Sequence, residues 1–199
     1  PPGGDRNPES VLARANLLLG AFGPRHRYLS LSDLVVRTGL PKSTVHRTAQ
    51  QMRDLGWLVY HDTKYSLGIQ LFELAGLVAV RHELRETVFP FMADLYETTR
   101  ATVHLGVRVQ HEVLYVEKLA GHDRVIDESR VGGRLPLYRT GIGKVLLAFS
   151  SEAVLQEVLR HGMTPRTSAT IVTESRLRRE LAEVVEFGVA FDREESVVG

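Results

Sequence analysis

Residues 39–60 read GLPKSTVHRTAQQMRDLGWLVY, and this stretch decides the fold of the first part of the chain. Pro41 suits the first position of a helix and Gly56 suits its end, so the spacing predicts a helix between them. The apolar residues at helical spacing, which we expect to form its buried face, are Val45, Ala49, Met52 and Leu55. Residues 57–60 are aromatic and β-branched, which is typical of a strand. A helix followed at once by a strand is therefore expected here.

Two further helices are expected before this stretch. Apolar residues recur at helical spacing over residues 10–22, and Gly23-Pro24 ends the pattern. Ser30 and Asp33 have the spacing of a capping box, which predicts the start of a short helix that Gly39 closes. The segment 39–60 is thus the third helix of a group and the strand after it.

A small hairpin is expected after the third helix. Residues 61–64 form a polar turn and residues 65–67 a second short strand. Three helices followed by a hairpin make a winged helix-turn-helix, whose last helix can lie in the major groove of DNA. The polar face of that helix can bond phosphates or base edges through Lys42, Ser43, Thr44, His46, Arg47 and Gln50, with Arg37 and Lys64 as secondary phosphate contacts. A solvated face would also be polar without DNA, and Thr44 can serve as a helix cap instead.

Composition supports a nucleic-acid partner and excludes several kinds of chemistry. Of the 199 residues, 43% are hydrophobic and 25% charged, and no run approaches the roughly 18 apolar residues of a membrane span. The start has no secretory signal, so we expect a soluble, cytoplasmic protein. Cysteine is absent, which excludes disulfides, thiolate metal sites and cysteine nucleophiles. Residues 1–70 carry nine basic against five acidic residues, and residues 71–199 carry sixteen against nineteen. This asymmetry favours a DNA contact in the first part, although such a charge is common in small domains.

The segment 69–80 is too apolar for a helix that hides a single stripe. Nine of its twelve residues are apolar, which predicts a linker helix buried on two sides. It would pack against its copy in a second subunit, or else form the central core helix of one domain. The candidate dimerisation residues are Ile69, Phe72, Leu74, Leu77 and Val78.

The second part of the chain alternates helices and strands. Strands are expected at 102–109, 113–117 and 124–131, with shorter candidates at 169–172 and 189–191, and helices at 82–99, 141–149, 151–160 and 174–187. Pro90 is expected to kink the first of these helices. The fold class that follows is α+β.

Several segments, in this order, resemble the IclR family of bacterial transcription regulators. They are residues 39–47 (GLPKSTVHR), 55–58 (LGWL), 65–68 (YSLG), 131–137 (VGGRLPL), 140–148 (TGIGKVLLA), 164–167 (TPRT), 170–171 and 188–195. The resemblance covers the chain from about Ser10 to Gly199. It implies a DNA-binding domain at 10–68, a dimerising linker at 69–82, and at 83–199 an α/β effector-binding domain similar to GAF or PAS sensors. Residues 1–9 combine Pro, Gly and charge without an apolar period, so we expect them to be a flexible lead-in. In the family this last domain continues past the position of Gly199, so we expect it to be incomplete here.

The loop at Thr140 is the most informative for a ligand. Its glycines let backbone N–H groups approach an anion at the start of the next helix, so a carboxylate could bind there. The resemblance implies effector contacts at Gly141, Ile142 and Asp192, while Leu135, Leu137 and Val125 could line the apolar side. The alternative is that Gly141 and Ile142 form only a helix-start turn and Asp192 a strand-end cap.

Enzyme motifs are incomplete throughout. Residues 141–146 (GIGKVL) fail both the dinucleotide and the P-loop pattern, residues 82–86 (HELRE) lack the second histidine of a zinc protease, and no GxSxG occurs. The eight histidines are dispersed without a pair at metal-ligand spacing, so we expect no catalytic metal, no cofactor and no enzyme.

The combined prediction is a homodimeric or tetrameric repressor of a catabolic operon. It would bind a roughly palindromic DNA operator under the control of a small organic or aromatic acid. One alternative is a small enzyme at residues 100–199 with a winged helix used for protein contacts. Another is a regulator that has lost its ligand.

Overall fold

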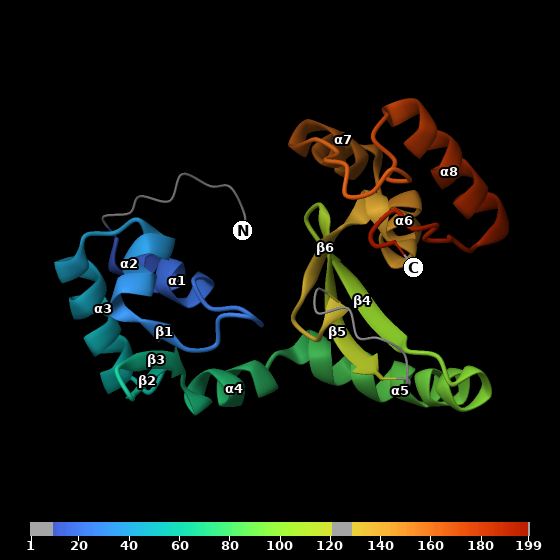
Figure 1. Ribbon diagram of the computed structural model, residues 1–199. Helices are drawn as coiled ribbons and strands as arrows, with labels where there is room; N and C mark the ends of the chain where they lie inside the picture. Colours follow the sequence, from blue (N-terminus) through green and yellow to red (C-terminus); the bar gives the residue numbers. More distant parts are fainter. Residues whose placement is uncertain (1–9, 121–128, 199) are drawn as a thin grey trace. The chain divides into compact units, whose positions relative to one another are not determined.

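The chain forms two units, Pro1–His82 and Glu83–Gly199 (Figure 1). The computed structural model describes residues 10–120 and 129–198, so the expected lead-in at 1–9 lies outside the described residues. Helices and antiparallel sheets occur in both units, which confirms the α+β class. No helix among the described residues is long and apolar enough to cross a membrane.

The first unit is a winged helix-turn-helix. Its elements are α1 (Val11–Gly20), β1 (Leu29–Ser30), α2 (Leu31–Thr38), α3 (Lys42–Asp54), β2 (Leu58–His61) and β3 (Lys64–Leu67). The strands form one antiparallel sheet in the order β1-β3-β2, in which the sequence analysis missed β1. Asp62 and Thr63 turn the hairpin with φ of 48° and 64°, the left-handed backbone that a two-residue turn requires.

Local signals set the ends of α2 as expected. The Ser30 hydroxyl accepts a hydrogen bond from the Asp33 N–H at 3.1 Å, and the Asp33 carboxylate accepts one from the Ser30 N–H at 2.9 Å. Hydrogen bonds from the Ser30 side chain and backbone hold the pKa of Asp33 below its usual value. Gly39 closes the helix at φ 68°, where a side chain would be strained. The predicted capping box is therefore confirmed.

Two details of α3 differ from expectation. Pro41 is the N-cap with ψ 141°, so the helix begins one residue later, at Lys42; the proline ring fixes φ and leaves ψ free to be extended. Leu55, at the C-cap, is 56% exposed because it lies beyond the core. Thr48 is buried instead and completes the inner face. That core joins the three helices to the wing through Leu18, Leu34, Val45, Ala49, Met52, Leu58 and Tyr65.

The linker is divided between two helices, and the first of them is not buried within the single chain. Helix α4 (Ile69–Gly76) ends at a glycine, which disfavours helix, and α5 (Ala79–Thr99), which contains Pro90, begins after a short break. No side chain of α4 is buried. The expected continuous helix over 69–80 is wrong, whereas its expected burial against a second subunit stays a prediction.

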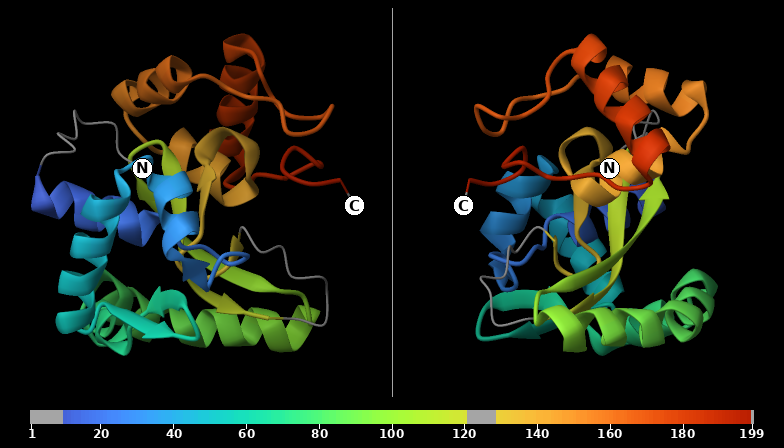
Figure 2. Two further views of the ribbon diagram at one scale, coloured as in Figure 1. Left: turned by 60° about the vertical axis from the view of Figure 1, so that its left-hand side comes forward. Right: turned by 90° about the vertical axis from the view of Figure 1, so that its right-hand side faces the viewer.

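The second unit is built on a three-stranded antiparallel sheet. Its elements after α5 are β4 (Val103–Val109), β5 (Glu112–Leu119), β6 (Arg134–Pro136), the 3-10 helix η2 (Leu137–Arg139), α6 (Gly141–Ala148), α7 (Glu152–His161) and α8 (Glu174–Phe187). The strand order is β4-β5-β6. Helix α5 lies at one end of the β4–β5 hairpin, and α6, α7 and α8 gather towards the other (Figures 1 and 2).

Three expected strands of this unit are not found as such. The third strand of the sheet is β6, whereas most of 124–131 lies outside the described residues and residues 129–131 form a turn. Residues 169–172 and 189–191 are not strands, and no described strand lies beside them as a pairing partner. The first of these segments is held by side-chain bonds, since the Thr170 hydroxyl donates to the Glu195 carbonyl at 2.7 Å.

Candidate DNA interface and effector site

The polar face of α3 lies in solvent, opposite its buried stripe. Lys42 and Ser43 in the first turn are exposed, as are His46 and Arg47 one turn later. Thr44 is half-buried. A basic first turn combined with the free N–H groups of a helix start can hold a phosphate, while Arg47 has the reach for a guanine edge. This face therefore has the chemistry of a DNA contact.

Two of the proposed DNA residues already have partners within the unit. The Gln50 amide donates to Asp54 at 3.1 Å and accepts from Arg53 at 3.1 Å. The Arg37 guanidinium donates to the Ala21 carbonyl at 2.7 Å, which ties α2 to the end of α1. Arg37 is thus better placed to position the helices than to reach phosphate.

The wing adds further cationic groups. Lys64 is exposed directly after the left-handed turn. Arg53, which the sequence analysis missed, lies over the Tyr60 ring with its guanidinium 5.2 Å from the ring centre. Its position three residues after Gln50 on the same helix face was the available signal.

The candidate effector site is built around the start of α6. The Thr140 hydroxyl caps this helix by accepting from the Gly143 N–H at 3.0 Å. A Cβ on Gly143 would lie 2.2 Å from the Leu137 carbonyl oxygen, and a Cβ on Gly141 would lie 3.3 Å from the Ala190 oxygen. Both glycines therefore permit close backbone approaches. The segment that leads to Asp192 lies against Gly141 at the start of α6. Gly141 and Asp192, two predicted site residues that are distant in sequence, therefore lie together.

The sheet contributes polar groups that the sequence analysis missed. Tyr115 on β5 is buried, which raises the pKa of its hydroxyl, and it hydrogen-bonds the Thr140 side chain. The His104 ring of β4 lies edge-on to Tyr115, with ring centres 5.3 Å apart. Burial lowers the pKa of His104, and its Nε2 has no hydrogen-bond partner in the part of the chain that the structure describes. A Cβ on Gly106, two residues after His104, would lie 3.0 Å from the Ile142 side chain, so β4 faces the start of α6.

A fully buried ammonium group fixes the segment that carries Asp192. Lys144 Nζ donates to Glu195 at 2.8 Å, to Glu180 at 2.8 Å and to the Phe191 carbonyl at 2.5 Å. A buried charge is tolerated only when it is paired in this way. Lys144 thus joins α6 to α8 and to residues 191–195.

Asp192 and Glu195 form an acidic pair joined by hydrogen bonds. Asp192 accepts hydrogen bonds from the Glu195 N–H at 2.8 Å and the Ser196 N–H at 3.4 Å. Partial burial, together with its hydrogen bond to the Glu195 carboxyl, raises the pKa of Asp192 to about 6. Burial alone would raise the pKa of Glu195, but hydrogen bonds from Asp192, Lys144 and the Arg193 N–H hold it below its usual value. Asp192 is therefore the member of the pair that takes up a proton first.

Two of the three residues expected to line the apolar side of the effector site belong to the hydrophobic core. Leu137 is fully buried and Leu135 is 5% exposed, and both belong to the hydrophobic core of the second unit. Ile142 is half-buried at the start of α6. Val125 lies outside the described residues.

Comparisons with known proteins agree on one family. The model of the IclR helix-turn-helix domain matches residues 11–62, and that of the bacterial transcriptional regulator IclR C-terminal domain matches residues 76–199. The regulator XynR of Escherichia coli is 34% identical over 189 residues, which cover 94% of this chain and 75% of XynR. The regulator KdgR of Escherichia coli is 33% identical over 200 residues, which cover 98% of this chain and 76% of KdgR.

A solved structure adds a ligand to the comparison. An IclR homologue from Microbacterium hydrocarbonoxydans, crystallised in complex with 4-hydroxybenzoate, is 34% identical and superposes with a TM-score of 0.82. The superposition covers 90% of this chain and 75% of that one. The fold of this chain is thus shared with a protein that holds an aromatic acid.

Proposed function

The chain belongs to the IclR family of bacterial transcriptional regulators, and we propose that it is a homo-oligomeric repressor of a catabolic operon. It is a DNA-binding regulator controlled by a small ligand. Its relatives are regulators of transcription, and in our proposal the chain catalyses no reaction and needs no cofactor.

The observation that carries the DNA-binding role is the exposed face of α3. It presents Lys42, His46 and Arg47 opposite the buried stripe of Val45 and Ala49. In this proposal Ser43, Thr44 and Lys42 hold phosphate at the helix start and Arg47 reaches a base or a second phosphate. Gln50 and Lys64 lie at the edges of the contact, and Arg37 supports it from α2.

Selection of genomic DNA tests this role. Purified protein is mixed with fragmented DNA at two salt concentrations, and the retained fragments are sequenced. We expect a few fragments that share an inverted repeat. The Arg47→Ala variant should bind them more weakly, with a salt dependence reduced by about one ion if Arg47 contacts phosphate, or with relaxed sequence preference if it contacts a base. Arg176→Ala removes an exposed arginine of α8 and is the matched control. Equal binding by both variants would exclude Arg47 from the interface.

The effector we propose is a small hydroxylated carboxylic acid that binds at the start of α6. Its carboxylate would meet the backbone N–H groups of Gly141 and Ile142. Asp192, once protonated, can donate to that carboxylate, and His104 and Tyr115 offer polar groups to a ring hydroxyl. The 4-hydroxybenzoate of the relative has this chemistry.

Thermal unfolding in the presence of candidate acids tests this site. We expect 4-hydroxybenzoate or a related hydroxy acid to raise the melting temperature of the wild type. The rise should be lost in Gly141→Trp, because the new side chain would displace residues 190–192 from the start of α6. Val185→Trp, on an exposed position of α8, is the control for a new tryptophan. A rise of equal size in Gly141→Trp would overturn the assignment of the pocket.

We propose that subunits associate through α4 and the residues after it. Ile69, Phe72 and Leu77 are 70%, 68% and 81% exposed, and Leu74 and Val78 add to the same apolar surface. A dimer would present two α3 helices to a roughly palindromic operator. Ligand binding to residues 83–199 would change the DNA affinity of residues 10–68 through the linker at 69–82. The change would come from the difference in the ligand's affinity for two arrangements of the subunits.

A further inference from the structure

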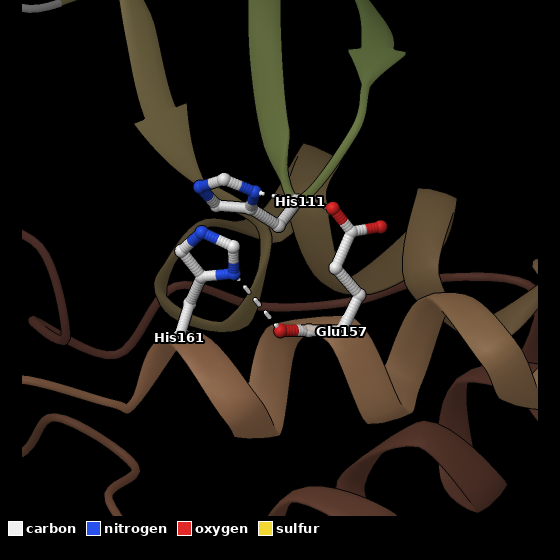
Figure 3. A group of neighbouring side chains, drawn as sticks. All are labelled: His111, Glu157 and His161. Atoms are coloured by element: carbon white, nitrogen blue, oxygen red, sulfur yellow. Dashed lines mark hydrogen bonds and ion pairs between the residues drawn. The ribbon is translucent and has the colours of Figure 1, made fainter. Parts of the chain in front are cut away.

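Two histidines and a glutamate meet at the end of the sheet near α7. His111 lies in the turn between β4 and β5, whereas Glu157 and His161 lie one turn apart on α7 (Figure 3). One ligand atom from each side chain lies within 4.8 Å of the others. The histidines are fifty positions apart in sequence, so the fold brings together what the sequence analysis read as dispersed residues without a metal site.

A hydrogen bond to the backbone orients the ring of His161. The Glu157 carbonyl oxygen lies 3.2 Å from His161 Nδ1 and can only accept, so Nδ1 carries the proton. The Nε2 lone pair of His161 is then available as a ligand, as in most histidines that bind metals. The two imidazole rings stack with centres 3.7 Å apart.

His111 contributes a nitrogen that lacks a hydrogen bond. Its Nδ1 is buried and has no hydrogen-bond partner among the described residues, and the nearest carboxylate oxygen, on Glu157, is 3.7 Å away. That distance is too long for a hydrogen bond but close to the roughly 3.4 Å that separates two ligands of a tetrahedral ion with bonds of about 2.1 Å. A buried nitrogen without a hydrogen-bond partner beside a carboxylate would be satisfied by a metal ion between the two groups.

We propose that His111, Glu157 and His161 bind a divalent transition-metal ion of the zinc class. Two imidazoles and one carboxylate suit Zn²⁺ and Co²⁺ better than Mg²⁺ or Ca²⁺, which prefer oxygen ligands. His161 is exposed and lies in the last turn of α7 before Gly162, so its side chain can rotate out of the stack and bring its ligand atom to the ion. A cavity of about 290 Å³ adjoins the three side chains and is lined by His111, His161, Tyr138 and Glu112, so a fourth ligand such as water can reach the ion. The ion fastens the β4–β5 turn to α7.

Cobalt binding to the whole chain tests the site. Protein without an affinity tag is stripped with a chelator and titrated with Co²⁺, whose visible bands report three- or four-coordinate nitrogen and oxygen ligation. We expect one Co²⁺ per chain, displaced by Zn²⁺ and not by Mg²⁺. His161→Ala and Glu157→Gln should each weaken binding at least a hundredfold. His26→Ala removes an exposed histidine of the first unit and should bind as the wild type does.

Thermal unfolding gives a second readout. Zn²⁺ should raise the melting temperature of the wild type and of His26→Ala, and leave that of His161→Ala unchanged. His161→Ala should melt as the metal-free wild type does, because its side chain is exposed. No Co²⁺ bands in the wild type, or equal bands in His161→Ala, would overturn the proposal. Neither result touches the DNA-binding role, which uses other residues.

Discussion

The fully buried Lys144 fixes the geometry of the candidate effector site from outside it. Its three acceptors come from α8 and from residues 191–195, so one side chain positions Asp192 beside Gly141. Lys144 lies in the segment 140–148 that resembles the family, but nothing in that segment indicates this role. Burial of a lysine depends on partners 36 and 51 positions away, and no local pattern specifies such distant partners.

Removal of the Lys144 charge should strongly destabilise the second unit. Lys144→Met leaves Glu195 buried without its cation, a situation that costs about 3–5 kcal/mol. Denaturant unfolding measures the loss. The double variant Lys144→Met/Glu195→Gln should recover part of the stability, because neither buried partner is then charged. Lys118→Met, on the less buried face of β5, should change stability little; a wild-type-like Lys144→Met would show that the network contributes nothing.

Asp192 should make the stability of the protein fall between about pH 4 and pH 6. Its pKa rises from 3.8 to about 6 on folding, so the folded state holds a proton that the unfolded state releases, and the stability that this proton provides is lost as the pH rises. Asp192→Asn imitates the protonated form and does not titrate. At pH 7 it should be more stable than the wild type by about 1 kcal/mol, which is less than the full shift implies because the side chain is partly exposed.

Unfolding of both proteins in urea at pH 4 and pH 7 measures this difference. The two should be equally stable at pH 4, where Asp192 of the wild type is protonated. A constant difference at both pH values would exclude the raised pKa as its cause.

Helices were predicted more reliably than strands, because helix signals lie within the helix and its ends whereas a strand depends on a distant partner. Helices α2 and α3 were predicted because their end signals, such as Ser30 and Gly39, act on adjacent residues, and α8 was predicted from its amphipathic pattern. The strands expected at 169–172 and 189–191 failed because a β-branched run becomes a strand only beside a partner. Strands β1 and β6, of two and three residues, were missed since so short a run has no period to detect.

The capping box of α2 should contribute measurably to the stability of the first unit. Ser30→Ala removes the acceptor for the Asp33 N–H, and the loss should be about 1 kcal/mol. Ser32→Ala, two residues later and exposed, is the control and should be neutral or slightly stabilising, because alanine favours a helix interior. Thermal unfolding compares the two variants. Equal melting temperatures would mean that solvent replaces the Ser30 hydroxyl without loss.

For the whole molecule, the sequence predicted two functional parts but not the polar lining of the second. The outer face of α3 follows from one local period. His104 and Tyr115, in contrast, come from neighbouring strands and face the start of α6 only after the sheet has formed. Alternation along β4 and β5 could have indicated which side chains share a face, but not which helix covers it.

The exposed apolar residues of α4 are the basis of the proposal that the subunits associate. Burial of one large apolar side chain contributes about 1.5–3 kcal/mol, so an interface that covers Phe72 and Leu77 would lower the free energy of association. Phe72→Glu should therefore be a monomer in light scattering after size-exclusion chromatography. It should also lose affinity for an inverted repeat, because two α3 helices must bind together. Val185→Glu, on an exposed apolar position of α8, should leave both properties unchanged. If Phe72→Glu kept the wild-type mass and DNA affinity, the subunits would have to associate through another surface.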